Sequence, residues 1–174
     1  MGRQRQSPDD QLKKVLAVIE KHRAQAEKEG HSFTASTEEQ LREKLGRVNS
    51  PMLVSQGWTG APAGGTVAYN VSVFNPDPTA WPSVFVHVFV GAANIPASVG
   101  EALALVDPRF PRLTQPDFAG LQLAANSAQT VNFTLQVPAG VEKTNYLGNA
   151  FLFQSMWHDP GLYLDRSIFV FKVT

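Results

Sequence analysis

The sequence predicts an antiparallel β-sandwich preceded by a two-helix segment. Several short apolar stretches of strand length follow residue 50, and many alternate in side-chain type. Clusters of glycine and proline, which are typical of turns, separate these stretches. The apolar residues before residue 50 instead have the spacing of helices. We therefore expect a helical segment over 1–49 and a sandwich over 50–174, with an open β-barrel as the alternative arrangement.

The composition is that of a globular protein whose second part carries little charge. The chain has 174 residues, is 43% hydrophobic and has a formal net charge of zero, so nothing indicates a nucleic acid or membrane partner. Residues 1–50 hold 10 of the 15 Lys and Arg and 8 of the 15 Asp and Glu. A weakly charged sandwich is consistent with contact to another protein, or with a polar but uncharged surface.

The sequence has no cysteine, which excludes disulfides, thiolate metal sites and cysteine nucleophiles. The basic first residues are not followed by an apolar region, so we expect no signal peptide. No apolar run is long enough to span a membrane. We expect a cytoplasmic protein, or a secreted one if a leader has been removed.

The first expected helix covers about 8–29. Ser7 is a good N-cap, Pro8 suits the first helical position, and Gly30 is a natural end. The helix has a single apolar stripe at the spacing i, i+3, i+4, i+7. The stripe consists of Leu12, Val15, Leu16 and Ile19.

A shorter helix is expected over about 37–45. Residues 36–39, S-T-E-E, have the pattern of a capping box, and Gly46 is expected to end the helix. Leu41 and Leu45 are its main apolar residues. Neither helix has enough apolar surface to fold alone, so both need a partner surface.

Seven strands are expected after residue 50. A glycine-rich loop over 57–65 and a proline turn over 75–79 separate the first three. A long crossing over 91–120 contains an expected short helix, 99–105, behind a second capping box. The expected strands are 52–56, 66–74, 83–90, 121–123, 130–137, 146–156 and 163–173.

Three of these strands have apolar side chains on both faces, which means that both faces need cover. Tyr146 has the position of a tyrosine-corner residue and shares its parity with Ala150 and Leu152, so we expect this aliphatic face to point between the sheets. The expected aliphatic face is Val84, Val86, Val88, Val90, Ala150, Leu152, Ile168 and Val170. The expected outer face, called the Phe face, is Phe85, His87, Phe89, Phe151, Phe153, Phe169 and Phe171.

Two segments resemble bacterial immunoglobulin-like domains of the adhesion-related type. They are G-G-T-V-A-Y-N-V-S-V-F-N-P (64–76) and L-Q-L-A-A-N-S-A-Q-T-V-N-F-T-L-Q-V-P (121–138), and the resemblance covers about 52–174. It implies an immunoglobulin-like sandwich that serves as a binding or spacer module. The chain departs from the family at Asn126, where the family often has glycine, in its long 91–120 crossing and in its helical N-terminal segment.

An exposed Phe face would be larger than the apolar patches that soluble monomers tolerate. The expected cover is the chain's own helix 8–29, with its apolar stripe laid on the Phe face. A second subunit, or another protein, is the alternative cover. A cavity for a hydrophobic ligand beneath the helix is a third arrangement.

No motif for catalysis, a cofactor or a metal is present. The sequence lacks a G-x-S-x-G elbow, a P-loop, a dinucleotide fingerprint and an H-E-x-x-H motif. His158 and Asp159, with Asp165, have no recognised metal-ligand spacing. His22 and His31 lie among charged residues and are expected to be solvated. We therefore expect no enzyme.

Three tryptophans lie in or beside expected loops, where they could stack on sugars or close the ends of the sandwich core. These are Trp58, Trp81 and Trp157. The expected function is non-enzymatic protein–protein interaction or structural assembly, with the chain itself or another protein as partner. A carbohydrate-binding module that uses the tryptophans is the alternative.

Overall fold

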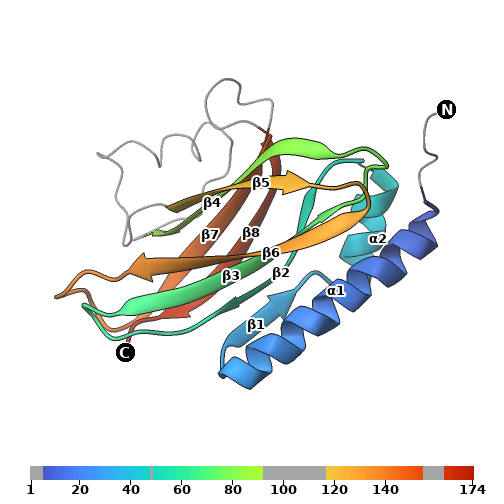
Figure 1. Ribbon diagram of the computed structural model, residues 1–174. Helices are drawn as coiled ribbons and strands as arrows, with labels where there is room; N and C mark the ends of the chain where they lie inside the picture. The colour runs from blue at the N-terminus through green and yellow to red at the C-terminus, as the bar shows by residue number, and fades with distance from the viewer. Residues whose placement is uncertain (1–5, 48, 92–116, 155–162) are drawn as a thin grey trace.

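The computed structural model describes residues 6–47, 49–91, 117–154 and 163–174, and Figure 1 shows their arrangement. Two four-stranded antiparallel sheets pack face to face, with the strand orders β1-β2-β3-β6 and β5-β4-β7-β8. This is the predicted antiparallel sandwich. The strands are β1 (Ser32–Ala35), β2 (Met52–Trp58), β3 (Thr66–Asn75), β4 (Trp81–Gly91), β5 (Asp117–Leu123), β6 (Ser127–Gln136), β7 (Asn145–Phe153) and β8 (Tyr163–Lys172).

Helix α1 (Pro8–Glu29) has the predicted bounds. The Ser7 hydroxyl accepts a hydrogen bond from the Asp10 amide at 3.3 Å, as an N-cap should. Gly30 ends the helix with a φ of 70°, a conformation that glycine adopts without strain. Among the described residues, no helix is long and apolar enough to cross a membrane.

Helix α2 (Glu38–Arg47) begins and ends slightly later than predicted. Its capping box consists of Thr37 and Gln40. The Thr37 hydroxyl accepts from the Gln40 amide at 3.2 Å, and the Gln40 side chain accepts from the Thr37 amide at 2.9 Å. The helix continues through Gly46, so the prediction that this glycine ends it was wrong.

Strand β1 was not predicted. It has four residues, S-F-T-A, which lie between the two helices in the sequence, and it pairs antiparallel with β2. A segment this short with two small polar residues carries a weak strand pattern, and only its pairing with β2 makes it a strand. β1 is an edge of its sheet.

Strand β8 turns the opposite face inward from the one expected. Its register with β7 places Phe169 opposite Gly148 and Phe171 opposite Tyr146, on the side of β7 that faces the other sheet. Phe169 and Phe171 are therefore buried in the inter-sheet core, whereas Ile168 and Val170 point outward. The assignment of these two phenylalanines to the outer Phe face was wrong.

Gly148 explains why the Phe169 ring fits inside. A Cβ at residue 148 would lie 2.0 Å from the Phe169 ring, so the ring occupies the space that a side chain would fill. From there the ring stacks on Tyr69, with 4.5 Å between the ring centroids. The inter-sheet core also contains the predicted aliphatic row of β4 and β7, namely Val84, Val86, Val88, Val90, Ala150 and Leu152.

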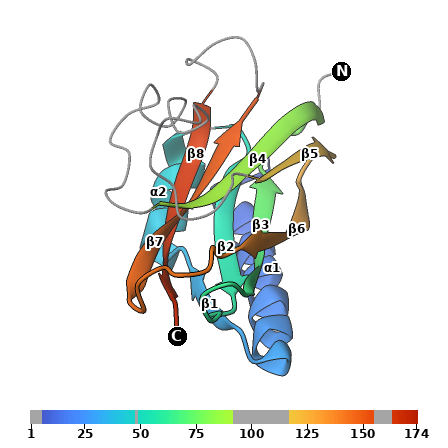
Figure 2. The ribbon, with the colours of Figure 1, turned by 90° about the vertical axis from the view of Figure 1, so that its left-hand side faces the viewer.

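Helix α1 covers the other sheet. Figures 1 and 2 show it beside β1, β2 and β3, on the side of the molecule away from β7 and β8. The prediction that its stripe docks on the Phe face was wrong. The outer face of β2 and β3 is itself apolar at one end, and the helices complete a second core there. That core contains Leu12, Val15, Ile19, Leu41, Leu45, Met52, Val54 and Phe74, with Leu16 partly buried against it.

Tyr146 makes the contact expected of a tyrosine corner. Its hydroxyl donates to the Glu142 carbonyl oxygen at 2.8 Å, and its ring packs against the inter-sheet core. This bond fixes the turn that leads into β7.

Candidate functional site

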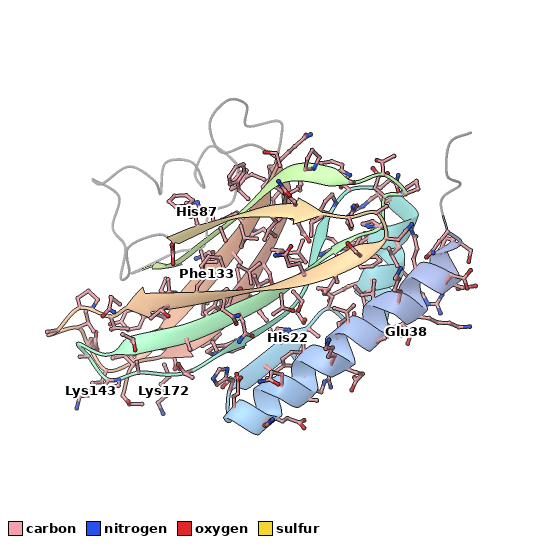
Figure 3. All side chains as sticks on the ribbon, in the orientation of Figure 1. His22, Glu38, His87, Phe133, Lys143 and Lys172 are labelled. Atoms are coloured by element: carbon pink, nitrogen blue, oxygen red, sulfur yellow. The ribbon has the colours of Figure 1, made fainter. Side chains whose placement is uncertain are left out.

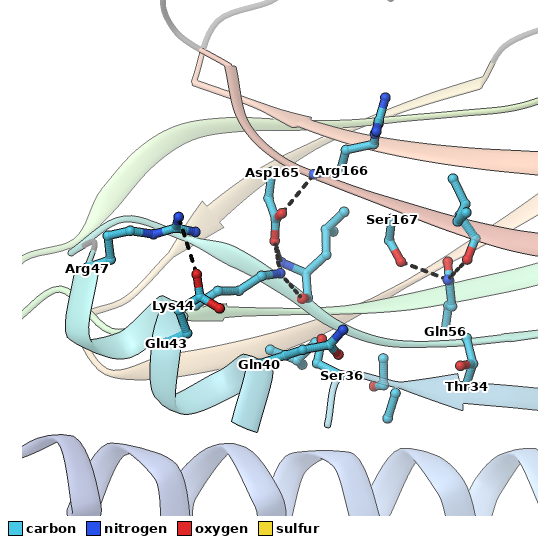
Figure 4. A pocket seen from close by; sticks show the side chains of 15 residues that line it. Thr34, Ser36, Gln40, Glu43, Lys44, Arg47, Gln56, Asp165, Arg166 and Ser167 are labelled. Atoms are coloured by element: carbon cyan, nitrogen blue, oxygen red, sulfur yellow. Dashed lines mark hydrogen bonds and ion pairs between the residues drawn. The ribbon is translucent and has the colours of Figure 1, made fainter. Parts of the chain in front are cut away.

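A groove of about 360 Å³ opens at the side of the sandwich where α2, β1 and β2 approach β8 (Figure 4). Side chains from both sheets line it, so it marks the seam between them. Most of its lining side chains are polar. They include Thr34, Ser36, Gln40, Glu43, Lys44 and Arg47 on one side and Asp165, Arg166 and Ser167 on the other.

Asp165 joins β8 to the opposite sheet and to α2. Its carboxylate accepts from Lys44 Nζ at 2.8 Å and from the Leu53 amide at 2.9 Å. The ion pair with Lys44 is largely shielded from solvent, which strengthens its electrostatic attraction. The carboxylate thus ties the backbone of β2 to β8.

Gln56 makes the second connection across the seam. Its Nε2 donates to Ser167 Oγ at 2.8 Å and to the Ile168 carbonyl oxygen at 2.6 Å. Its Oε1 accepts from the Tyr69 hydroxyl at 2.7 Å. Complete burial raises the pKa of Tyr69 well above 10, so this hydroxyl remains protonated and a donor at neutral pH.

Two of the cations that line the groove are paired with carboxylates. Lys44 is paired with Asp165, and Arg47 lies 3.5 Å from Glu43, so the charges of these side chains are matched within the groove. Within the described ranges, no group of three His, Cys, Asp or Glu side chains could hold a metal ion.

His22 lies on the buried face of α1 and is only 6% exposed, so the prediction that it is solvated was wrong. Its Nδ1 lies 2.7 Å from Ser55 Oγ, and its Nε2 contacts Asn70 Oδ1. Because the Asn70 oxygen can only accept, we assign the proton to Nε2, and Nδ1 then accepts from the Ser55 hydroxyl. Burial lowers the pKa of His22 from its usual 6.5, although the Asn70 bond opposes this shift.

The serine, histidine and asparagine of this cluster are connected in the order of a catalytic triad, but the arrangement is structural. Ser55 is 4% exposed and lies under α1, so a substrate could not reach its hydroxyl without displacement of the helix. A signal for this site was present in the sequence. His22 follows Val15 by seven residues and Ile19 by three, so it continues the buried stripe of the helix.

The outer face of β8 carries a row of outward-pointing side chains, called the β8 row, of which the last three are exposed and the first is half-buried. It consists of Arg166, Ile168, Val170 and Lys172. Ile168 is 43% exposed and Val170 is 53% exposed, and Leu147 of β7 lies opposite Val170. Ile168 also lines the groove, so the apolar part of the row is continuous with the groove's edge.

The outer face of β4 and β7 retains part of the predicted Phe face. Phe151 and Phe153 are buried there, and their rings pack against each other and against Tyr163. Phe85 is half-buried and lies opposite Phe153. The side chain of Phe89 lies outside the described residues.

His87, which is labelled in Figure 3, is also buried on this outer face. Its ring stacks on Phe118 of β5, with 4.3 Å between the centroids, and Phe118 is 36% exposed. This aromatic contact agrees with the predicted place of His87 on the Phe face.

The two tryptophans that the structure describes pack against the inter-sheet core. Trp58 lies beside Phe169, with 5.3 Å between the rings, and the Trp81 indole donates to Asp77 at 2.9 Å. The rings of Trp58, at the end of β2, and Trp81, at the start of β4, thus extend the inter-sheet core. Trp157, the residues 158–159 and the expected helix over 99–105 lie outside the described residues.

Comparisons with known proteins identify the fold. No protein-family model matches the chain, and no curated protein matches it. The C-terminal domain of wzt is similar at a TM-score of 0.50 and 8% identity, covering 83% of this chain and 78% of that one. A CARDB domain from Pyrococcus furiosus aligns with a TM-score of 0.44 and 12% identity, over 71% of this chain and 90% of that one.

A family 2 glycosyl hydrolase from Bacteroides cellulosilyticus aligns with a TM-score of 0.46 and 12% identity. The match covers 73% of this chain but only 15% of the hydrolase. At such identities the likeness concerns the fold alone. The chain is an immunoglobulin-like antiparallel β-sandwich with two added helices.

Proposed function

We propose that this chain is a non-catalytic module that binds another protein through the β8 row. The exposure of Ile168 and Val170 is the observation that carries the proposal. Two neighbouring β-branched side chains on a sheet face form an apolar surface whose exposure to water is unfavourable, so their burial lowers the free energy. Complete burial of an exposed aliphatic side chain is worth about 1.5–3 kcal/mol, and about half of each of these two side chains is still exposed, so burial of the pair contributes about 1.5–3 kcal/mol in total.

The charges around the apolar pair define the chemistry of the partner. Arg166 precedes it and Lys172 follows it on the same face of β8. Figure 3 shows Lys143 and Lys172 at the same end of the molecule. A partner with apolar side chains flanked by carboxylates would match this row, with the apolar contact at the centre and the ion pairs at the rim.

The fold is compatible with this role. Immunoglobulin-like sandwiches carry many functions, so the fold alone does not select one. The resemblance of segments 64–76 and 121–138 to adhesion-related domains favours a binding or spacer role. The packing of Trp58 and Trp81 against the core does not favour stacking on sugars.

The proposal can be tested with a double variant, Ile168→Asp with Val170→Asp. Both side chains are exposed, so the variant should fold, which circular dichroism and thermal unfolding would verify. The wild-type and variant chains would be immobilised and compared for capture of proteins from the cells that express the protein. We expect a saturable partner that the wild-type chain retains and the variant loses by at least tenfold, about 1.4 kcal/mol.

The matched control is Asn132→Asp with Thr134→Asp, which adds the same charge to exposed positions on β6 of the other sheet. This control should retain the partner. Equal capture by all three proteins would contradict the proposal. Saturable binding to a glycan array, with no protein captured, would support the carbohydrate-binding alternative.

A further inference from the structure

Strand β1 presents an unpaired backbone edge. The Ser36 amide donates to the Val54 carbonyl oxygen, which continues the β1–β2 register by one residue. In an antiparallel ladder, alternate residues direct their N–H and C=O groups to the same neighbour. The backbone groups of Ser36 and Thr34 therefore face β2, and those of Phe33 and Ala35 face away from it.

The pairing of β2 with β3 gives the same parity. The Thr59 amide donates to the Ala68 carbonyl oxygen of β3. The backbone groups of every second residue from Thr59 back to Ser55 therefore face β3, and the backbone groups of the residues between them face β1. Within the described part of the chain, the outward backbone groups of Phe33 and Ala35 have no hydrogen-bond partner. An unpaired strand edge is a template for another strand.

Both sides of this edge leave space for an added strand. A groove of about 450 Å³ lies between β1 and the side of α1 that carries Leu16, Ile19 and Arg23. The polar groove at the β8 seam lies on the other side. Side chains of an added strand, which point alternately to the two faces, could enter both grooves.

The sequence of β1 is complementary to itself. In an antiparallel pairing of two copies centred on Thr34, Phe33 of each copy lies opposite Ala35 of the other. Each such pair can exchange both backbone hydrogen bonds, because these are the residues with outward groups. A large ring then lies beside a small side chain on the α1 side, and two threonines meet on the other side, which is a favourable cross-strand pair.

We propose that two copies of this chain associate through β1, edge to edge and antiparallel, to form one continuous sheet twice as wide. The contact is symmetric, with Thr34 on the two-fold axis, as closed dimers require. The hydrogen bonds of this contact come from β1 and not from β8, although both strands border the polar groove. Variants at residues 34 and 35 and variants at residues 168 and 170 therefore test the two proposals separately. Because β1 has only four residues, the dimer is weak and forms at high protein concentration.

The first experiment is sedimentation of the full chain over a wide range of concentrations. We expect the wild-type protein to pass from monomer to dimer as the concentration rises. The Ala35→Pro variant removes an outward N–H without a loss of β1–β2 bonds, which proline tolerates on an edge strand. It should raise the dimer dissociation constant at least tenfold.

The matched control is Thr134→Pro on β6, the other edge of the same sheet, where the same parity argument directs the N–H outward. This variant should dimerise like the wild type. Amide hydrogen exchange gives a second reading. The amides of Phe33 and Ala35 should exchange rapidly at low concentration and become protected as the dimer forms.

A charge exchange at Thr34 tests the register and does not depend on the proline variant folding. Thr34 is exposed, so Thr34→Lys and Thr34→Glu should each fold but remain monomeric, because like charges meet at the two-fold axis. An equimolar mixture of the two variants should restore the dimer. A wild-type chain that stays monomeric throughout, or a dimer unaffected by Thr34→Lys, would overturn the proposal.

Discussion

Replacement of His22 by phenylalanine tests whether the buried polar cluster attaches α1 to the sheet. Phenylalanine places a ring of similar shape against Phe33. In the wild type, the imidazole meets the Phe33 ring edge-on, with 5.0 Å between the ring centroids. The substitution removes both ring nitrogens. The Ser55 hydroxyl and the Asn70 side-chain oxygen would then remain buried without the partner that they have in the wild type.

The expected loss of stability follows from these two groups. A buried polar group left without its hydrogen bond costs about 1–3 kcal/mol, so the two together should cost about 2–6 kcal/mol. In the His22→Phe variant, Ser72 keeps its hydrogen bond to Thr130 at 2.7 Å, so Ser72 adds little to the loss of stability. For a domain of this size each 1 kcal/mol lowers Tm by about 2–4 °C, so Tm should fall by roughly 4 °C or more.

Urea unfolding at pH 7.5 would measure the difference in the free energy of unfolding. The matched control is His31→Phe, because the His31 Nδ1 lies 3.5 Å from Glu29, too far for a strong hydrogen bond, so this variant should change stability by about 0.5 kcal/mol or less. A loss below about 1 kcal/mol for His22→Phe, or an equal loss for both variants, would refute the reasoning.

The same variant isolates a pH effect. Burial lowers the pKa of folded His22, whereas the unfolded chain titrates near 6.5, so the unfolded state binds more protons between these values. Stability from this group is complete above pH 6.5 and is lost as pH falls toward the folded pKa. The free-energy difference between wild type and His22→Phe should therefore shrink below pH 6.5. A difference independent of pH would contradict this assignment.

Two further substitutions test the placement of aromatic residues. Gly148→Ala places a Cβ 2.0 Å from the Phe169 ring and should destabilise the fold by about 3 kcal/mol or more in chemical unfolding. The double variant with Phe169→Leu should recover part of this loss, and no recovery would place the strain elsewhere. Tyr146→Phe removes the bond to the Glu142 carbonyl and should cost about 1 kcal/mol in thermal unfolding, whereas an unchanged Tm would mean that the corner adds no stability.

Part of the candidate site could be predicted and part could not. The sequence predicted an outer apolar sheet face near the C-terminus that needs cover, but on β8 the outward pair is Ile168 and Val170 and not Phe169 and Phe171. Alternation within β8 was predicted correctly, since its two sets of side chains do point to opposite faces. The direction of each set depends on the register with β7, and a shift by one residue exchanges the two faces.

The groove at the β8 seam could not be found from the sequence. Lys44 and Asp165 are separated by 121 residues, and Gln56 and Ile168 by 112. Neither pair follows a local pattern, and each forms only when the two sheets are packed. Short β1 was missed for the same reason, because its strand conformation depends on the edge of β2.

The sequence by itself determined the start and end of α1, the approximate positions of strands β2 to β8 and the tyrosine corner at Tyr146. These features depend on capping, periodicity and turn chemistry, which act between residues only a few positions apart. Only the tertiary structure decided which sheet the helices cover, which face of β8 is exposed and which side chains His22 contacts. These features depend on register and on the match between distant apolar faces, and such contacts form only when segments far apart in the chain are brought together.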